Sequence, residues 1–201
     1  MTARLGVFLS GSGRTLENLV TTIARGALDA TIPLVVASRE CRGADIARAL
    51  GIHTRVITGT PSPEAVGSLA REHQLDWVAL AGYLKLLPIP ASLTGRVVNI
   101  HPALLPDFGG PGMHGMKVHQ AVAAAARDGR ITETGCTVHL CDAHYDTGPI
   151  VLQRSCPVAP SDTPDDIAAR VFALEQQAYP EALSILFSGG FSGNASPDPA
   201  E

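Results

Sequence analysis

Short apolar runs that alternate with helical patterns constrain the fold of this 201-residue chain more than any other feature. These runs are rich in Val, Leu, Ile and Ala and lack polar alternation, which is typical of strands covered on both faces of a sheet. We expect helices from residue 14, over 44–50 and over 63–73, and strands at 5–9, 32–37, 53–57, 77–81 and 97–101. The β-α-β-α-β-α-β order predicts a parallel sheet with right-handed crossovers.

The pattern changes in the second half of the chain. A Gly- and Pro-rich loop over 106–112 precedes another helix. Strands predicted at 135–140 and 150–158 are joined by a link too short for a helical crossover, so this pair should be antiparallel. A last helix begins near Thr163, and Pro180 should kink or split it. The predicted fold class is therefore α/β and Rossmann-like, with a mostly parallel sheet, helices on both faces and an antiparallel C-terminal strand pair.

Composition limits the kinds of protein that this chain can be. Residues 1–187 suit a single domain, and residues 188–201, rich in Gly, Ser, Pro and acidic side chains, are expected to form a flexible tail. The net charge of −4 argues against a nucleic-acid surface. The apolar stretches break within about ten residues, too short to span a membrane. With no secretory signal pattern, the chain is predicted to be cytoplasmic, and its four cysteines to be free, buried thiols.

A glycine-rich turn, Ser10-Gly11-Ser12-Gly13-Arg14-Thr15, joins the first predicted strand to a helix. Backbone amides at such a junction form an anion-binding cradle. Leu16 replaces the third glycine of the dinucleotide fingerprint, and the Lys-Ser/Thr pair of the phosphate loop is missing. The turn therefore favours one phosphate of a small substrate, with Arg14 and Thr15 assisting. The alternative is that its glycines serve only tight strand–helix packing.

A polar cluster is expected where the strand at 97–101 ends. Asn99 and His101 are alternate residues of this strand and share a face, and Asp146 lies in a turn-rich link that can reach the same edge. A nearby carboxylate raises the pKa of a histidine and orients its ring. We therefore expect a cationic His101 that stabilises an oxyanion together with the Asn99 carboxamide. The alternative is that Asn99 and His101 only cap the strand.

Other polar residues give weaker signals. His114 and His119 lack the HExxH spacing, so no metal site is predicted. His139 lies in a predicted strand, where it could be a core residue or a supporting group. Ser10 and Ser12 lack the elbow motif of a serine nucleophile.

Three segments resemble the folate-dependent formyltransferases of purine biosynthesis, the phosphoribosylglycinamide formyltransferase family. They are Ser10–Leu16, Asn99–Pro106 and Asp146–Ile150, and the similarity extends over roughly residues 4–187. The resemblance implies a Rossmann-like fold and transfer of a formyl group from the co-substrate 10-formyltetrahydrofolate to the amine of 5-phosphoribosylglycinamide, without a metal. The implied partners are these small molecules, not nucleic acid or a membrane, and a homodimer is a further possibility.

The resemblance also implies roles for individual positions. Asn99, His101 and Asp146 would be catalytic, and Glu175 would bind the substrate ribose. The substrate phosphate would be bound by Gly13, Arg14 and Thr15. The folate would be bound by Leu84, Lys85, Leu86, Leu87, Asn99, Asp142, Ala143, His144, Tyr145 and Asp146.

Two departures from the family pattern concern folate contacts. Pro63 stands where many relatives carry an arginine before Glu-Ala, and the segment 108–115 is longer than the common Pro-Gly-Leu-His version, so we expect a reshaped loop. The rival functions are a formyltetrahydrofolate hydrolase, in which water replaces the amine, and a non-catalytic nucleotide-binding module.

Overall fold

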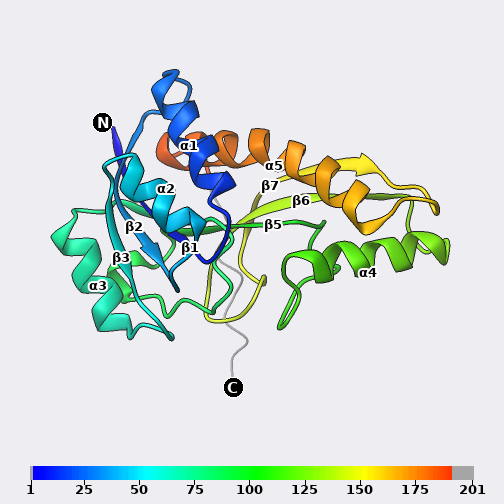
Figure 1. The fold of residues 1–201 in the computed structure, drawn as a ribbon, viewed down its shortest axis with the longest axis horizontal. Coiled ribbons are helices and arrows are strands. Elements are labelled where there is room, and N and C mark those ends of the chain that lie inside the picture. The colour runs from blue at the N-terminus through cyan, green and yellow to red at the C-terminus, as the bar shows by residue number, and fades with distance from the viewer. Residues whose placement is uncertain (1, 192–201) are drawn as a thin grey trace.

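The computed structural model describes residues 2–191, which form one seven-stranded sheet flanked by helices (Figure 1). The strands are β1 (Ala3–Leu9), β2 (Ala30–Ala37), β3 (His53–Val56), β4 (Trp77–Leu80), β5 (Val97–His101), β6 (Glu133–Leu140) and β7 (Ile150–Pro157). The helices are α1 (Arg14–Ala24), α2 (Arg42–Ala49), α3 (Pro63–Glu72), α4 (Met116–Arg127) and α5 (Pro164–Phe187), with a short 3₁₀ helix at Ala91–Leu93.

The sheet order is β3-β2-β1-β4-β5-β6-β7. Strands β1 to β5 are parallel, whereas β6 is antiparallel to β5 and β7 to β6. The predicted fold class is confirmed, including the antiparallel C-terminal pair. The strand order reverses between β1 and β4, and ligands of open α/β sheets bind at such a switch point, outside the carboxyl ends of the strands. The ends of β1, β4 and β5 therefore mark the expected place for a site.

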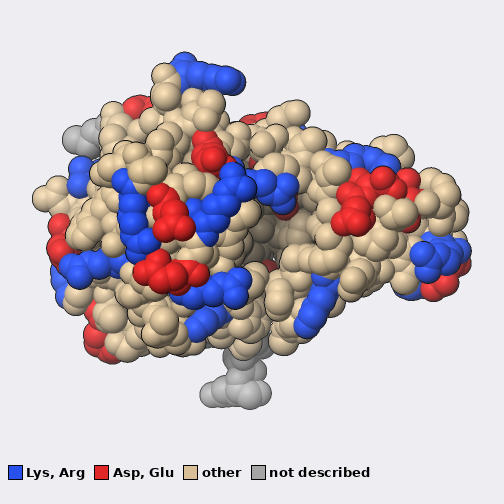
Figure 2. All heavy atoms as spheres, in the orientation of Figure 1, with Lys and Arg blue, Asp and Glu red and all other residues tan. Residues whose placement is uncertain are grey.

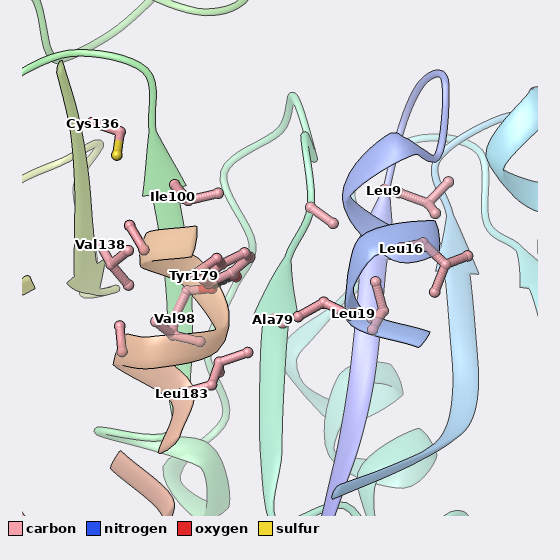
Figure 3. Close-up of a cluster of buried hydrophobic side chains, with 14 of the residues drawn as sticks. Leu9, Leu16, Leu19, Ala79, Val98, Ile100, Cys136, Val138, Tyr179 and Leu183 are labelled. Atoms are coloured by element: carbon pink, nitrogen blue, oxygen red, sulfur yellow. Dashed lines mark hydrogen bonds between the residues drawn. The ribbon is translucent and has the colours of Figure 1, made fainter. Parts of the chain in front are cut away.

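Buried apolar side chains form a cluster on each face of the sheet. On one face, Val66 and Ala70 of α3 pack over β1, β2 and β4. On the other face, residues of α1, α2, α4 and α5 share one larger cluster, which includes Leu16 and Leu19 of α1 (Figure 3). Both leucines are fully buried, as the helical spacing of the apolar residues predicts.

Helix α5 is continuous through Pro180, so the predicted split is wrong. Proline has no N–H to donate to the carbonyl of Gln176, four residues earlier. That carbonyl instead accepts a hydrogen bond from Nδ2 of Asn18 on α1, at 2.9 Å. A partner from another helix thus satisfies the acceptor that proline leaves open.

Tyr179 fixes α5 against β4 and β5 (Figure 3). Its hydroxyl lies 3.1 Å from the carbonyl oxygen of Leu80 and 3.0 Å from that of Val98. A fully buried hydroxyl requires such partners, because leaving it unpaired would cost about 1–3 kcal/mol. Glu175 lies four residues before Tyr179, on the same side of the helix, so this contact also places Glu175 near the strand ends.

The structure also bears on the predictions for the cysteines, the C-terminal residues and membrane-spanning helices. All four cysteines are unpaired, but only Cys136 is buried and the other three are half-buried. Ser188 caps α5 and Phe191 packs against the core, whereas residues 192–201 of the predicted tail lie outside the described residues. Within residues 2–191, no helix combines the length and hydropathy needed to cross a membrane.

Candidate active site

A cavity of about 380 Å³ lies at the carboxyl ends of β1, β4 and β5 and extends to α4 and α5. In the space-filling view it corresponds to a hollow between the main body and the extension formed by β6, β7 and α4, with basic side chains on both sides (Figure 2). Every residue predicted for the site lines this cavity except Ala143. Its volume is in the range of small-molecule sites.

The glycine-rich turn forms one wall of the cavity. Gly13 has φ +80°, and a Cβ added there would lie 2.6 Å from Cα of Gly43 on α2. The Gly43 N–H also donates to the carbonyl oxygen of Gly11 at 2.9 Å. These glycines therefore do allow tight packing of the turn against α2, as the alternative interpretation of the sequence predicts. Gly13 caps α1 without a side chain, so the first amides of the helix can still bind an anion.

Arg14 and Glu175 lie on the same side of the cavity. The guanidinium carbon of Arg14 is 4.0 Å from the ring centroid of Phe172 on α5, which is a cation–π contact that holds the charge in place. Burial raises the pKa of Glu175 to about 7, although the positive charge of Arg14 opposes the shift. This wall therefore offers a fixed cation beside a carboxyl group that holds its proton to higher pH than an exposed glutamate does.

The structure brings Asn99, His101 and Asp146 together at the end of β5. Nδ1 of His101 lies 3.5 Å from Oδ2 of Asp146, and Nδ2 of Asn99 lies 3.5 Å from Oδ1 of the same carboxylate. The side chains of His101 and Asp146 are only 3% and 9% exposed. A carboxamide, an imidazole and a carboxylate therefore lie together in one part of the cavity where solvent exposure is low.

The loop after β5 holds this group from the other side. Nε2 of His101 donates to the carbonyl oxygen of Phe108 at 2.9 Å, and the N–H of Gly110 donates to Oδ2 of Asp146 at 3.0 Å. A Cβ on Gly109 would lie 3.3 Å from Cβ of Asp146 and only 2.6 Å from Cδ2 of Leu105. Glycine at this position therefore allows the loop to approach the carboxylate closely.

Burial of the ring opposes the expectation that Asp146 keeps His101 cationic. Burial lowers the pKa of His101 below 6.5, and this effect outweighs the Asp146 charge and the Phe108 carbonyl, which raise it. For Asp146, burial raises the pKa, but contacts with His139, His101 and the Gly110 N–H together lower it below 3.8. Burial therefore favours the neutral form of the His101 imidazole in the free protein, while the Asp146 carboxylate stays ionised at neutral pH.

Two further buried histidines, neither predicted to be catalytic, also line the cavity. His139 is 2% exposed, and its Nε2 lies 3.1 Å from Nδ2 of Asn99 and 3.5 Å from Oδ1 of Asp146. His119 of α4 is 7% exposed, and burial together with the charge of His101 lowers its pKa. The helical spacing of His119 with Val122 and Ala126 could have revealed its burial.

Acid should destabilise the folded protein through His73, His101 and His119, because burial lowers the pKa of each below 6.5. The unfolded chain takes up these protons near pH 6.5, and the folded chain only at lower pH. The contribution of these residues to stability is therefore complete above pH 6.5 and is lost as the pH falls through the folded pKa values. Each group contributes at most about 1.4 kcal/mol per pH unit.

Glu175 should act in the opposite direction. Between pH 4.5 and 7 its carboxyl keeps a proton in the folded state that it releases on unfolding, which favours the fold toward acid. We expect the free energy of unfolding, measured in urea, to fall from pH 7 to pH 5, and to fall more steeply in the Glu175→Gln variant. An equal or shallower slope in the variant would contradict the raised pKa of Glu175.

Comparisons with known proteins agree with this arrangement. The chain matches the family described as Formyl transferase over residues 3–183. It is 38% identical, over 91% of its length, to a protein named phosphoribosylglycinamide formyltransferase, chloroplastic, from Vigna unguiculata, and spans 60% of that relative's length. The crystal structure of glycinamide ribonucleotide transformylase 1 from Symbiobacterium toebii superposes with a TM-score of 0.81 at 32% identity, covering 94% of this chain and 89% of that one.

A more distant structure shares the fold alone. A formyltetrahydrofolate deformylase from Pseudomonas syringae superposes with a TM-score of 0.79, but at 22% identity, and the match covers 94% of this chain and 62% of that chain. The family match includes the glycine-rich turn, the end of β5 and the segment that carries Asp146. The chain belongs to the formyl transferase family.

Proposed function

We propose that this chain transfers the formyl group of 10-formyltetrahydrofolate to the amine of 5-phosphoribosylglycinamide, a step of de novo purine biosynthesis. The observation that carries the proposal is that one cavity joins an anion-binding turn to a buried carboxamide, imidazole and carboxylate. Relatives named for this activity support it. Formyl-folate acts here as a co-substrate, and no step requires a metal.

The proposal divides the cavity between the two substrates. The phosphate binds at Gly13, Arg14 and Thr15, and the ribose at Glu175. The pterin lies near the loop after β4 and the loop before β7. These loops contain the folate-binding candidates Leu84, Lys85, Leu86, Leu87, Asp142, Ala143, His144, Tyr145 and Asp146, and Asn99 lies between them on β5. The hydroxyl of Tyr145 accepts a hydrogen bond from the Leu86 N–H at 2.9 Å, which ties the two loops together.

In the proposed reaction the amine nitrogen attacks the formyl carbon, and the carbonyl oxygen becomes an oxyanion. An N–H of Asn99 and the Nε2–H of His101 are the donors that stabilise this charge. A neutral imidazole can do so, since it still carries one N–H. In the free protein this N–H is bonded to the Phe108 carbonyl, so the formyl oxygen must replace that carbonyl when the substrates bind.

The proton balance gives Asp146 its role. The attacking nitrogen becomes positively charged and must lose a proton, and the departing folate nitrogen must gain one. The lowered pKa of Asp146 keeps its carboxylate ionised at neutral pH. We assign it the transfer of this proton, directly or through a water molecule, as the bond between the formyl carbon and the folate nitrogen breaks.

A spectroscopic assay of folate release, with and without 5-phosphoribosylglycinamide, tests the proposal against its rivals. Release only when the amine substrate is present is expected. Release without it would indicate a formyltetrahydrofolate hydrolase, in which the anion-binding turn would have no substrate phosphate to bind. No release in either case would indicate a nucleotide-binding module.

Arg14→Gln should raise the KM for 5-phosphoribosylglycinamide by about 10- to 100-fold, because a hydrogen bond to a charged group contributes about 1.5–3 kcal/mol. The KM for formyl-folate should change little. Arg25→Gln, on an exposed residue just after α1, is the matched control and should resemble the unaltered protein. An unchanged KM for the amine substrate in Arg14→Gln would place the phosphate elsewhere.

The remaining assignments are also proposals. Residues 1–187 would form a single catalytic domain. The protein would be cytoplasmic, act on small molecules and have no nucleic-acid or membrane partner. Gel filtration with light scattering would decide whether it forms a homodimer.

A further inference from the structure

His139 is a buried histidine for which the proposed reaction has no role. It lies on β6, directly opposite Asn99 of β5 in the antiparallel ladder, so the two side chains are close neighbours on one face of the sheet. It is 2% exposed, whereas Asn99 is half-buried and lines the cavity. Any constraint that His139 places on Asn99 therefore acts at the reacting centre.

The hydrogen bonds of His139 define its tautomer. Nδ1 lies 2.9 Å from the carbonyl oxygen of Leu140, which can only accept, so Nδ1 carries the hydrogen. In the neutral ring Nε2 then has a lone pair and can only accept. Its partner is Nδ2 of Asn99, at 3.1 Å.

The carboxylate of Asp146 supports the same orientation of the Asn99 carboxamide. Nδ2 of Asn99 also lies 3.5 Å from Oδ1 of Asp146, an oxygen that can only accept. Rotation of the amide by 180° would bring its oxygen against both the carboxylate and the lone pair of Nε2. A separation of 3.5 Å is at the outer limit of a hydrogen bond, so the second N–H of Asn99 is only weakly engaged.

We propose that His139 is a positioning residue that holds the Asn99 carboxamide with one N–H available to the reacting formyl oxygen. The proposal rests on the proposed formyl transfer. Without His139, the amide can turn and present its own oxygen to the developing oxyanion, which would repel that charge. His139 thus acts through Asn99 and does not itself touch the substrate.

Substitutions at position 139 test this role through kcat. His139→Phe, which removes the acceptor, should lower kcat by about 10- to 1000-fold, the upper limit being the loss of a whole oxyanion donor. The KM for 5-phosphoribosylglycinamide should change less than about threefold, since Asn99 acts on the transition state. His139→Gln places an amide oxygen where it can accept from Asn99 and should restore most of kcat. Equal losses in the Phe and Gln variants would overturn the proposal.

A double-mutant cycle separates positioning from a general structural effect. If His139 acts only through Asn99, His139→Phe should lower kcat by less than about twofold in an Asn99→Ala background. Full additivity of the two losses would contradict the proposal. Urea unfolding of each variant identifies any that fail to fold.

A measurement on the unaltered protein does not depend on activity. The ¹⁵N spectrum of the neutral His139 ring should show the hydrogen on Nδ1 and the lone pair on Nε2. The opposite tautomer would contradict the positioning role of His139 even if formyl transfer is observed. Absence of formyl transfer together with the expected tautomer would instead count against the proposed function.

Discussion

Alanine in place of His101 is expected to lower the kcat of formyl transfer by about 10²- to 10³-fold. The imidazole N–H is one of the two donors assigned to the oxyanion, and removal of one preorganised donor of this kind costs about 2.7–4 kcal/mol. Water could replace the side chain only poorly, because the position is 3% exposed. The KM values should change little, since the oxyanion exists only in the transition state and the intermediate.

The interpretation of this variant requires that the fold survive. The substitution also removes a contact with the Phe108 carbonyl, so the unfolding free energy of the variant must be measured beside its kinetics. His53→Ala is the matched control, because His53 is exposed on the edge strand β3 and does not line the cavity. It should keep kcat within about twofold. A folded His101→Ala variant with unchanged kcat would remove His101 from the mechanism.

The sequence was sufficient to predict the sheet and the polar group at its edge. Apolar runs in β1, β2, β4 and β5 lack polar alternation because helices cover both faces, and this burial is visible in the residues themselves. Asn99 and His101 share a face because side chains alternate along any strand. The turn-rich link around Asp146 suggested that it could reach them, and the family resemblance gave it a catalytic role, although its loop lies 45 residues beyond His101 in the sequence.

The properties that could not be predicted depend on distant contacts. The charge state of His101 is set by how deeply β5 is covered, and local sequence does not reveal that depth. Helix α5 continues through Pro180 because Asn18, 158 residues from Gln176, supplies the missing donor. The contact of His139 with Asn99 follows from the register of β5 and β6, and sequence alone leaves a register uncertain by a residue or more.

Asp146→Asn should lower kcat by about 10²- to 10⁴-fold, because the amide has nearly the same shape but cannot accept a proton from the attacking nitrogen. The variant can keep an oxygen toward the Gly110 N–H, which now donates to Oδ2 at 3.0 Å, so the loop should remain in place. Loss of the negative charge also removes an interaction that raises the pKa of His101. That pKa should therefore fall further, and the imidazole should stay neutral to lower pH.

The pH dependence of kcat distinguishes proton transfer from simple positioning by Asp146. If the carboxylate carries the proton, kcat should fall below pH 3.8 as Asp146 becomes protonated, and Asp146→Asn should lack this acid limb while remaining slow at every pH. Asp128→Asn, at the exposed end of α4, is the matched control and should keep the full profile. An Asp146→Asn variant with nearly normal kcat would assign the proton transfer to another group. A slow variant that retained the acid limb would show that Asp146 only positions its neighbours.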